Sequence, residues 1–201
     1  MNYSKLKSLV LIFSTISAVI FLQGCVPAVI GGTAVAAKVI SDPRTIGTQI
    51  DDETLEERVL AKLNKDPQLK KYARLNVVSY NNRILLIGQV PNQALKNRAT
   101  KIAASVEYVR EVFNYLAIGP NLSAGRILKD SWITSKAKSE LLITKGVKSP
   151  DIKVITENGI VYLMGEVTPI EAQIAVNVVR KIDGVKKVIV LFQYITLSNN
   201  L

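Results

Sequence analysis

The sequence predicts an α+β protein in which an αββαβ unit occurs twice in tandem, after an export signal and a flexible tether. The first observation is an internal repeat, because residues 75–90 align without a gap with residues 152–167 and place Gly88 opposite Gly165. The second is that each segment divides into two runs rich in β-branched residues, which is typical of a strand pair. The third is an apolar residue at every fourth position before each segment, which indicates an amphipathic helix.

Residues 1–24 predict a signal peptide and not a membrane span. Lys5 and Lys7 precede an apolar run, Ser8 to Leu22, of 15 residues, whereas a membrane-spanning helix needs about 20. After it, the order Gln23-Gly24-Cys25 places a small residue directly before the only cysteine of the chain. This order resembles the lipobox of bacterial lipoproteins. The resemblance implies cleavage before Cys25, a diacylglycerol on its thiol and an acyl chain on the new amino group.

The other interpretation of Cys25 is an inert buried cysteine, which leaves the order of charged, apolar and small residues unexplained. With a single cysteine the chain forms no internal disulfide. Val26 follows Cys25 where some lipoproteins have Asp. In Gram-negative lipoproteins this resembles the default pattern for sorting to the outer membrane. Residues 25–50, rich in Gly, Ala and Pro without a clear period, then predict a lipidated tether.

The first copy of the unit spans residues 51–118, and its first helix has the apolar stripe Leu55, Val59 and Leu63. The acidic cluster at residues 51–57 has two interpretations. Either it favours the positive end of the helix dipole, or its carboxylates hold a metal ion. The dipole interpretation is the simpler one, because the chain has no histidine and no second cysteine. Asn81-Asn82 predicts the hairpin turn, and Asn92 predicts the cap of the second helix.

A linker at residues 119–128 leads to the second copy at residues 129–196. Asn158-Gly159 supplies the positive φ angles of a tight hairpin turn. Thr168 predicts an N-cap followed by Pro169 at the first helical position, and Gly184 predicts the end of this helix. Each copy has about 65 residues, a size at which a hydrophobic core is only marginally sufficient. We therefore expect the two copies to pack against each other.

The αββαβ order with a glycine closing the second strand resembles the BON domain of bacterial envelope proteins. The wider pattern is a lipobox, then "SDPRTIGTQIDDETLEERV", then a second copy that opens "DSWITSKAKSELL". It is similar to outer-membrane lipoproteins with two BON domains. That resemblance implies a periplasm-facing protein that binds anionic phospholipid through its second domain, gathers at the division site and supports envelope integrity. It also implies a link to the machinery that inserts β-barrels, and docking on that machinery is the alternative function.

Composition limits the classes of function. Without Lys5 and Lys7 the chain has 24 Lys and Arg against 16 Asp and Glu, a net charge of +8, which predicts a polyanionic partner. Export separates the protein from nucleic acid, and no basic motif interleaved with aromatic residues is present, so anionic phospholipid of the outer membrane is the expected partner. With no histidine, and with its only thiol assigned to lipid, we expect no enzyme activity, no metal site and no cofactor besides the acyl chains.

The first helices of the two copies differ in charge, from −2 over residues 51–65 to +2 over residues 129–145. The second copy's helix is expected to run roughly from Ser131 to Thr144, with one face in the core. The stripe away from that face is the predicted phospholipid contact and consists of Trp132, Lys136, Ser139 and Ile143. In the alternative interpretation, the ring of Trp132 folds back over the edge of the sheet.

Overall fold

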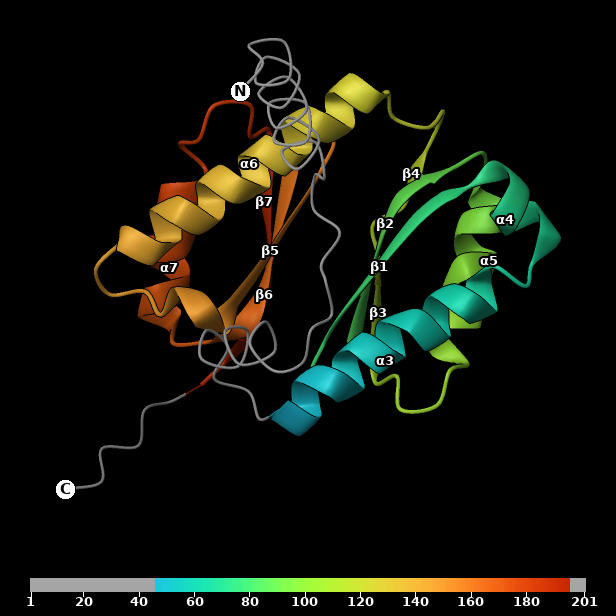
Figure 1. Cartoon of the computed structure of the whole chain (residues 1–201), viewed down its shortest axis with the longest axis horizontal. Coiled ribbons are helices and arrows are strands. Elements are labelled where there is room, and N and C mark those ends of the chain that lie inside the picture. The colour runs from blue at the N-terminus through green and yellow to red at the C-terminus, as the bar shows by residue number, and fades with distance from the viewer. Residues whose placement is uncertain (1–45, 196–201) are drawn as a thin grey trace, which may run out of the picture. The chain divides into compact units, whose positions relative to one another are not determined.

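The computed structural model describes residues 46–195, with side chains from residue 51 onward. These residues form two successive α+β domains, each with its own sheet (Figure 1). Cys25 and the expected signal peptide lie outside the described residues. Residues 46–50, which the sequence places in the tether, belong to the first helix.

The first domain contains α3 (Ile46–Leu63), α4 (Pro67–Tyr72), β1 (Arg74–Tyr80), β2 (Arg83–Val90), α5 (Gln93–Ala104), β3 (Glu111–Asn114) and β4 (Ala117–Ile118). β1 pairs antiparallel with β2, while β3 and β4 pair parallel with β2. The expected αββαβ order is confirmed, with α4 as an addition and with the third strand interrupted. α3 and α5 cover the same face of the sheet (Figure 1).

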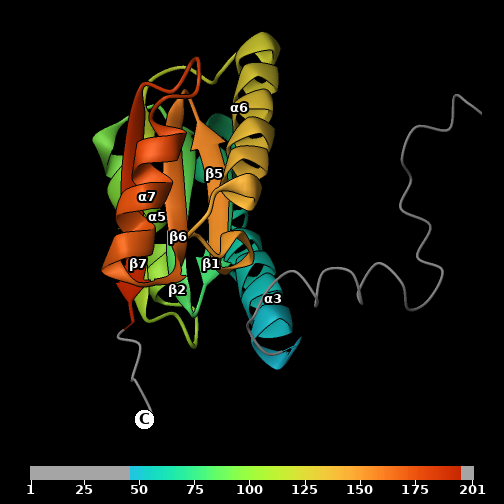
Figure 2. The same cartoon turned by 90° about the vertical axis from the view of Figure 1, so that its left-hand side faces the viewer.

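The second domain contains α6 (Ala124–Ile143), the short 3-10 helix η1 (Ser149–Asp151), β5 (Ile152–Glu157), β6 (Ile160–Val167), α7 (Pro169–Val179) and β7 (Lys187–Tyr194). β5 pairs antiparallel with β6, and β7 pairs parallel with β6. Figure 2 shows α6 and α7 on the same face of this sheet. The expected start of α6 at Ser131 was wrong: the Ser123 hydroxyl accepts the backbone N–H of Arg126 at 3.3 Å and caps the helix earlier.

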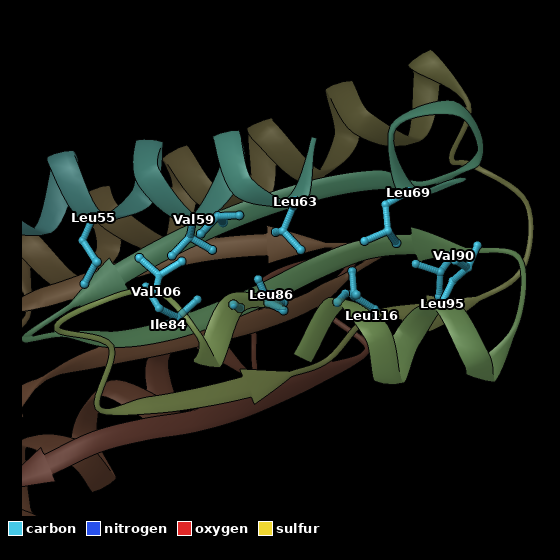
Figure 3. Packing of buried hydrophobic residues seen from close by; sticks show 13 residues of the cluster. Leu55, Val59, Leu63, Leu69, Ile84, Leu86, Val90, Leu95, Val106 and Leu116 are labelled. Carbon is cyan, nitrogen blue, oxygen red and sulfur yellow. The ribbon is translucent and has the colours of Figure 1, made fainter. Parts of the chain in front are cut away.

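The predicted apolar stripes are confirmed as the core of each domain. In the first domain, Leu55, Val59 and Leu63 point from α3 toward Ile84 and Leu86 of β2 (Figure 3). The corresponding stripe of α6 is Ile133, Ala137 and Leu141, all with 0% exposure. Burial of each large apolar side chain contributes roughly 1.5–3 kcal/mol relative to its exposure.

The repeated glycines are explained by a close approach between strands. A Cβ atom on Gly88 would overlap the carbonyl oxygen of Arg74 on β1, and one on Gly165 would overlap the carbonyl oxygen of Asp151. Only glycine fits where two backbones come this close. The repeat therefore preserves a steric requirement of the β1–β2 and β5–β6 pairs.

Asp52 of the acidic cluster has a role that the sequence did not reveal. The prediction that the cluster favours the start of the helix was wrong, because α3 begins at Ile46 and has no acidic residue in its first turn. Asp52 is 3% exposed. Its carboxylate accepts hydrogen bonds from the Ser79 hydroxyl at 2.6 Å and from the backbone N–H groups of Asn81 at 2.9 Å and Asn82 at 3.1 Å. Asp52 thus ties α3 to the β1–β2 turn.

Hydrophobic side chains on the opposite faces of the two sheets contribute to one shared cluster. Its buried members are Val78, Tyr80, Leu85, Ile87, Tyr162, Met164 and Leu191. Polar contacts also join the domains: Arg74 pairs with Glu157, and Lys153 pairs with Glu56 at 2.6 Å. Burial, and then the charge of Glu157, raise the pKa of the Tyr162 hydroxyl. Each sheet therefore packs, through the face that its helices leave uncovered, against the other sheet.

Candidate lipid-binding surface

α6 has two apolar faces. One packs in the core, and the other is exposed. The four predicted contact residues all lie on the exposed side: Trp132 is 49% exposed, Ile143 is 76% exposed, and Lys136 and Ser139 are also exposed. A helix whose second face is also apolar has more exposed apolar surface than the fold requires.

Two large apolar residues of the same face were missed from the sequence. Leu128 is 71% exposed and Leu142 is 69% exposed. At about 100° per residue, Leu128 projects about 40° and Leu142 about 80° to one side of Trp132, so both lie on the exposed side of the helix. Leu128 was missed because the helix was expected to start after it. Leu142 lies within the expected helix and could have been found by widening the predicted stripe on the helical projection.

Lysines flank this apolar face. On the helical projection, exposed Lys129 and Lys136 lie on one side of it and exposed Lys138 lies on the other. The Lys136 ammonium pairs with the Glu140 carboxylate one turn along the helix at 2.7 Å. Long lysine side chains can keep their ammonium groups at headgroup level while neighbouring apolar groups enter more deeply. Such an arrangement is typical of helices that lie at a bilayer interface.

In the second domain most carboxylates are buried or half-buried. Of the seven carboxylates between residues 124 and 195, only Asp183 is exposed. The exposed basic residues number nine: Lys129, Lys136, Lys138, Lys145, Lys148, Arg180, Lys181, Lys186 and Lys187. The exposed side chains therefore carry nine positive charges against one negative. In the first domain, residues 51–120, the exposed side chains carry eight positive charges against five negative.

Three of these buried or half-buried carboxylates have structural uses. Asp130 holds the β5–β6 turn, and Glu171 forms a capping box with Thr168 at the start of α7. Glu157 accepts hydrogen bonds from Arg74 and Gln89 of the first domain. Because these carboxylates are engaged in contacts within the protein, the net positive charge of the exposed side chains is larger than the net charge that the composition of the second domain indicates.

Over residues 51–63, the corresponding helix of the first domain lacks the exposed apolar face. The positions that match the predicted contact are Thr54, Arg58, Ala61 and Lys65. Within residues 51–63, α3 has no large exposed hydrophobic residue. The two domains share one fold but differ here, so the exposed apolar face of α6 is not needed to form the core.

Trp132 also lines a groove between α6 and the end of α7. Val178 and Ile182 contribute to the same groove. The side chain of Trp132 therefore lies partly beside the end of α7, while about half of its surface is exposed to solvent.

Residues 46–195 contain no cluster of three metal-ligating side chains. None of the helices in that part of the chain is both long and apolar enough to cross a membrane.

Comparison with known proteins establishes the family. The BON domain family matches residues 51–120 and residues 129–196. Over 195 residues, which are 97% of this chain and 100% of the relative, the sequence is 54% identical to the outer membrane lipoprotein DolP of Haemophilus influenzae. The chain belongs to the DolP family. It is an outer membrane lipoprotein with two BON domains, as the sequence predicted.

Two further relatives resemble this DolP family member. The 21 kDa hemolysin of Actinobacillus pleuropneumoniae is 49% identical over 154 residues, which are 77% of this chain and 79% of that protein. The osmotically-inducible protein Y of Escherichia coli is 30% identical over 154 residues, which are 75% of this chain and 76% of that protein.

Proposed function

We propose that this DolP family member binds anionic phospholipids of the outer membrane through the exposed face of α6, while acyl chains on Cys25 anchor it in that membrane. One observation carries the proposal. Four large apolar side chains, Leu128, Trp132, Leu142 and Ile143, lie on one exposed helix face between flanking lysines. This pattern suits a bilayer interface and has no counterpart on residues 51–63 of α3.

Electrostatic attraction supplies the approach to the membrane. Each lysine near an anionic surface contributes about 1 kcal/mol, and this contribution weakens as salt shortens the Debye length. Most carboxylates of the second domain are buried or half-buried, so its exposed side chains are mainly positive and favour the attraction.

Insertion of the apolar face into the bilayer interface keeps the domain bound. Trp132 and Ile143 each add on the order of 1–2 kcal/mol of apolar transfer when partly immersed, and tryptophan favours the interfacial level of a bilayer. These contributions alone give weak binding. The anchor at Cys25 makes them sufficient, because it keeps the domain near the bilayer and raises its effective concentration there.

The proposed cellular role is support of envelope integrity at the division site, through recruitment to anionic phospholipid. The alternative is a docking module for the machinery that inserts β-barrels, with lipid contact only positioning the protein. The two differ in what the isolated protein does. Only the first requires direct binding to a pure lipid surface.

Vesicle co-sedimentation tests the proposal. Residues 25–201 carrying Cys25→Ser are mixed with vesicles of phosphatidylcholine alone or of phosphatidylcholine with phosphatidylglycerol. We expect sedimentation only with the anionic vesicles, decreasing as salt is added. Absence of binding to anionic vesicles at low salt would contradict the proposal and favour the docking alternative.

A further inference from the structure

A pocket of about 560 Å³ lies on the first domain, between α3, the β1–β2 turn and the turn that leads from α5 to β3. Its apolar lining consists of Leu55, which is buried, and Val109, which is half-buried. Its polar lining consists of Asp51, Thr54, Arg58, Asn82, Tyr108 and Arg110. The volume is in the range of pockets that bind ligands. Because all of these residues belong to the first domain, the pocket is separate from the exposed face of α6.

Tyr108 has a backbone conformation that tyrosine rarely adopts. Its φ angle is 72°, in the left-handed region where a Cβ atom crowds the backbone and a bulky residue is an outlier. Burial does not offset this strain, because Tyr108 is 65% exposed. Strained residues of this kind are concentrated at functional sites. The exposed ring therefore lowers stability without adding to the core.

The second domain has a glycine at the position of Tyr108, which is Gly184. Each of the two is followed, two residues later, by a backbone N–H that donates to the hairpin turn of its own domain, at 2.9 Å in the first and 2.8 Å in the second. Gly184 has a φ angle of 84°. The fold thus requires a positive φ angle here, and glycine meets this requirement without strain. The tyrosine of the first domain is not needed to form the turn.

Side chains of α6 occupy the corresponding space in the second domain. A Cβ atom on Gly184 would lie 2.9 Å from Cε of Lys129 and 3.1 Å from Cδ1 of Ile133. The residue of α3 that aligns with Lys129 is Asp51, whose side chain is shorter. The pocket and the strained tyrosine therefore occur together in the first domain, and the second domain has neither at this place.

Two charged side chains of the pocket have no partner within residues 51–195. Asp51 and Arg110 form no ion pair and no side-chain hydrogen bond in that range, either with each other or with a third residue. Arg58 is already engaged, because it pairs with Glu107 at 3.6 Å and its guanidinium lies 5.7 Å from the centroid of the Tyr108 ring. One carboxylate and one guanidinium are thus available, which favours a ligand with both charges over a simple anion.

We infer that this pocket docks an extended peptide segment of a partner protein, in which a basic and an acidic side chain flank an apolar one. The basic group pairs with Asp51, the acidic group pairs with Arg110, and the apolar group packs on the ring of Tyr108. Thr54 and Asn82 supply donors and acceptors for the peptide backbone, which has one of each in most residues. Tyrosine and arginine are also enriched among the residues that dominate binding at protein interfaces. The site goes beyond the lipid binding proposed for the second domain.

Peptide titration tests the inference on residues 25–201 carrying Cys25→Ser. The probes are acetylated, amidated peptides: Lys-Ala-Leu-Ala-Glu, its reverse Glu-Ala-Leu-Ala-Lys, and the neutral Gln-Ala-Leu-Ala-Gln. We expect saturable amide shifts at Asn82, Tyr108 and Arg110 with a charged peptide and none with the neutral one. Absence of saturation by both charged peptides at millimolar concentration would overturn the inference. So would equal shifts with the neutral peptide or with acetate alone.

Matched charge variants place the contact. Arg110→Gln should weaken binding of the charged peptide about threefold or more, as for loss of one exposed ion pair. Lys101→Gln is the control, because Lys101 is an exposed cation of the same domain that does not line the pocket. It should leave the affinity unchanged. Equal losses in the two variants would show general attraction and overturn the assignment to the pocket.

Tyr108→Gly separates docking from stability. Glycine adopts the positive φ angle without strain, so the urea midpoint should stay the same or rise, while peptide binding should fall about tenfold or more. Tyr108→Phe keeps the ring and should keep the binding. A lower midpoint for Tyr108→Gly would show that the tyrosine serves stability and would overturn the inference. Binding to anionic vesicles should be unchanged in these variants, so the lipid proposal is tested independently.

Discussion

The carboxylate of Asp130 accepts the backbone N–H of Gly159 at 2.8 Å, which ties the first helix of the second domain to its hairpin turn. The same carboxylate accepts the N–H of Asn158 at 2.7 Å and pairs with Arg126 at 2.9 Å. Asp52 makes the equivalent contacts in the first domain. A buried aspartate that closes the turn is thus a shared feature of both domains.

Replacement of this aspartate should destabilise the second domain. Asp130→Ala leaves two N–H groups and a partly buried guanidinium without their acceptor, so we expect the free energy of unfolding to fall by about 2–4 kcal/mol. Urea denaturation measures the change. Ser131→Ala, at the exposed neighbouring position, should change stability by less than about 0.5 kcal/mol. A loss at Asp130 no larger than at Ser131 would show that the turn is held by other contacts.

Trp132→Glu should abolish binding to anionic vesicles at every salt concentration, because it removes the largest apolar side chain of the exposed face and adds a negative charge. The domain should stay folded, since about half of the Trp132 surface is already exposed. Co-sedimentation measures binding, and amide spectra report the fold. Collapse of the amide spectra would instead place Trp132 in the core, as in the alternative interpretation.

Lys136→Gln should behave differently from Trp132→Glu. It removes one positive charge and no apolar surface, so binding should weaken and the slope of affinity against salt should become shallower. A series of sedimentation assays at increasing salt measures this slope. An unchanged slope would mean that Lys136 lies away from the bilayer surface.

Exchange of residues 51–65 with residues 129–143 should remove lipid binding from the second domain. The exchange keeps an aspartate to close each turn and an apolar core stripe in each domain. It places the acidic face of α3 where the apolar and basic face of α6 belongs. Unaltered binding by the second domain of the exchanged protein would show that the helix is not the determinant.

Acid should weaken the start of α7. Partial burial acts to raise the pKa of Glu171, but hydrogen bonds from the backbone and hydroxyl of Thr168 outweigh it and leave this pKa below its ordinary value. The contact therefore stabilises the fold above the ordinary glutamate pKa of about 4.3, and its contribution is lost as pH falls through the lower folded value. Glu171→Gln should cost about 0.5–1 kcal/mol at neutral pH. In urea denaturation, that difference should shrink toward zero in strong acid, and a constant difference would contradict this reasoning.

Cys25 should form the mature N-terminus and should be acylated. Intact-mass analysis of protein extracted from membranes decides this. A mature chain that starts elsewhere without lipid would contradict the lipobox assignment. So would a Cys25→Ser protein that remains integrated in the membrane.

Local features were predictable from the sequence. The hairpin turns follow from Asn81-Asn82 and from Asn158-Gly159, whose φ angles of 50°, 63°, 51° and 76° are positive as expected. Asn92 and Thr168 cap their helices as predicted. Each of these features depends on the conformational preference of a residue or on hydrogen bonds to its near neighbours. The internal repeat also made the order of helices and strands predictable, because one order had to fit both copies of the sequence.

Features that join distant residues were decided only by the tertiary structure. The burial of the carboxylates depends on partners such as Gly159 for Asp130 and Arg74 for Glu157, which lie far away in the sequence. The position of Trp132 beside Val178 and Ile182 likewise depends on how two separate elements meet. A sequence records which charges are present. Folding decides which of them it neutralises internally and which remain on the surface to meet a partner.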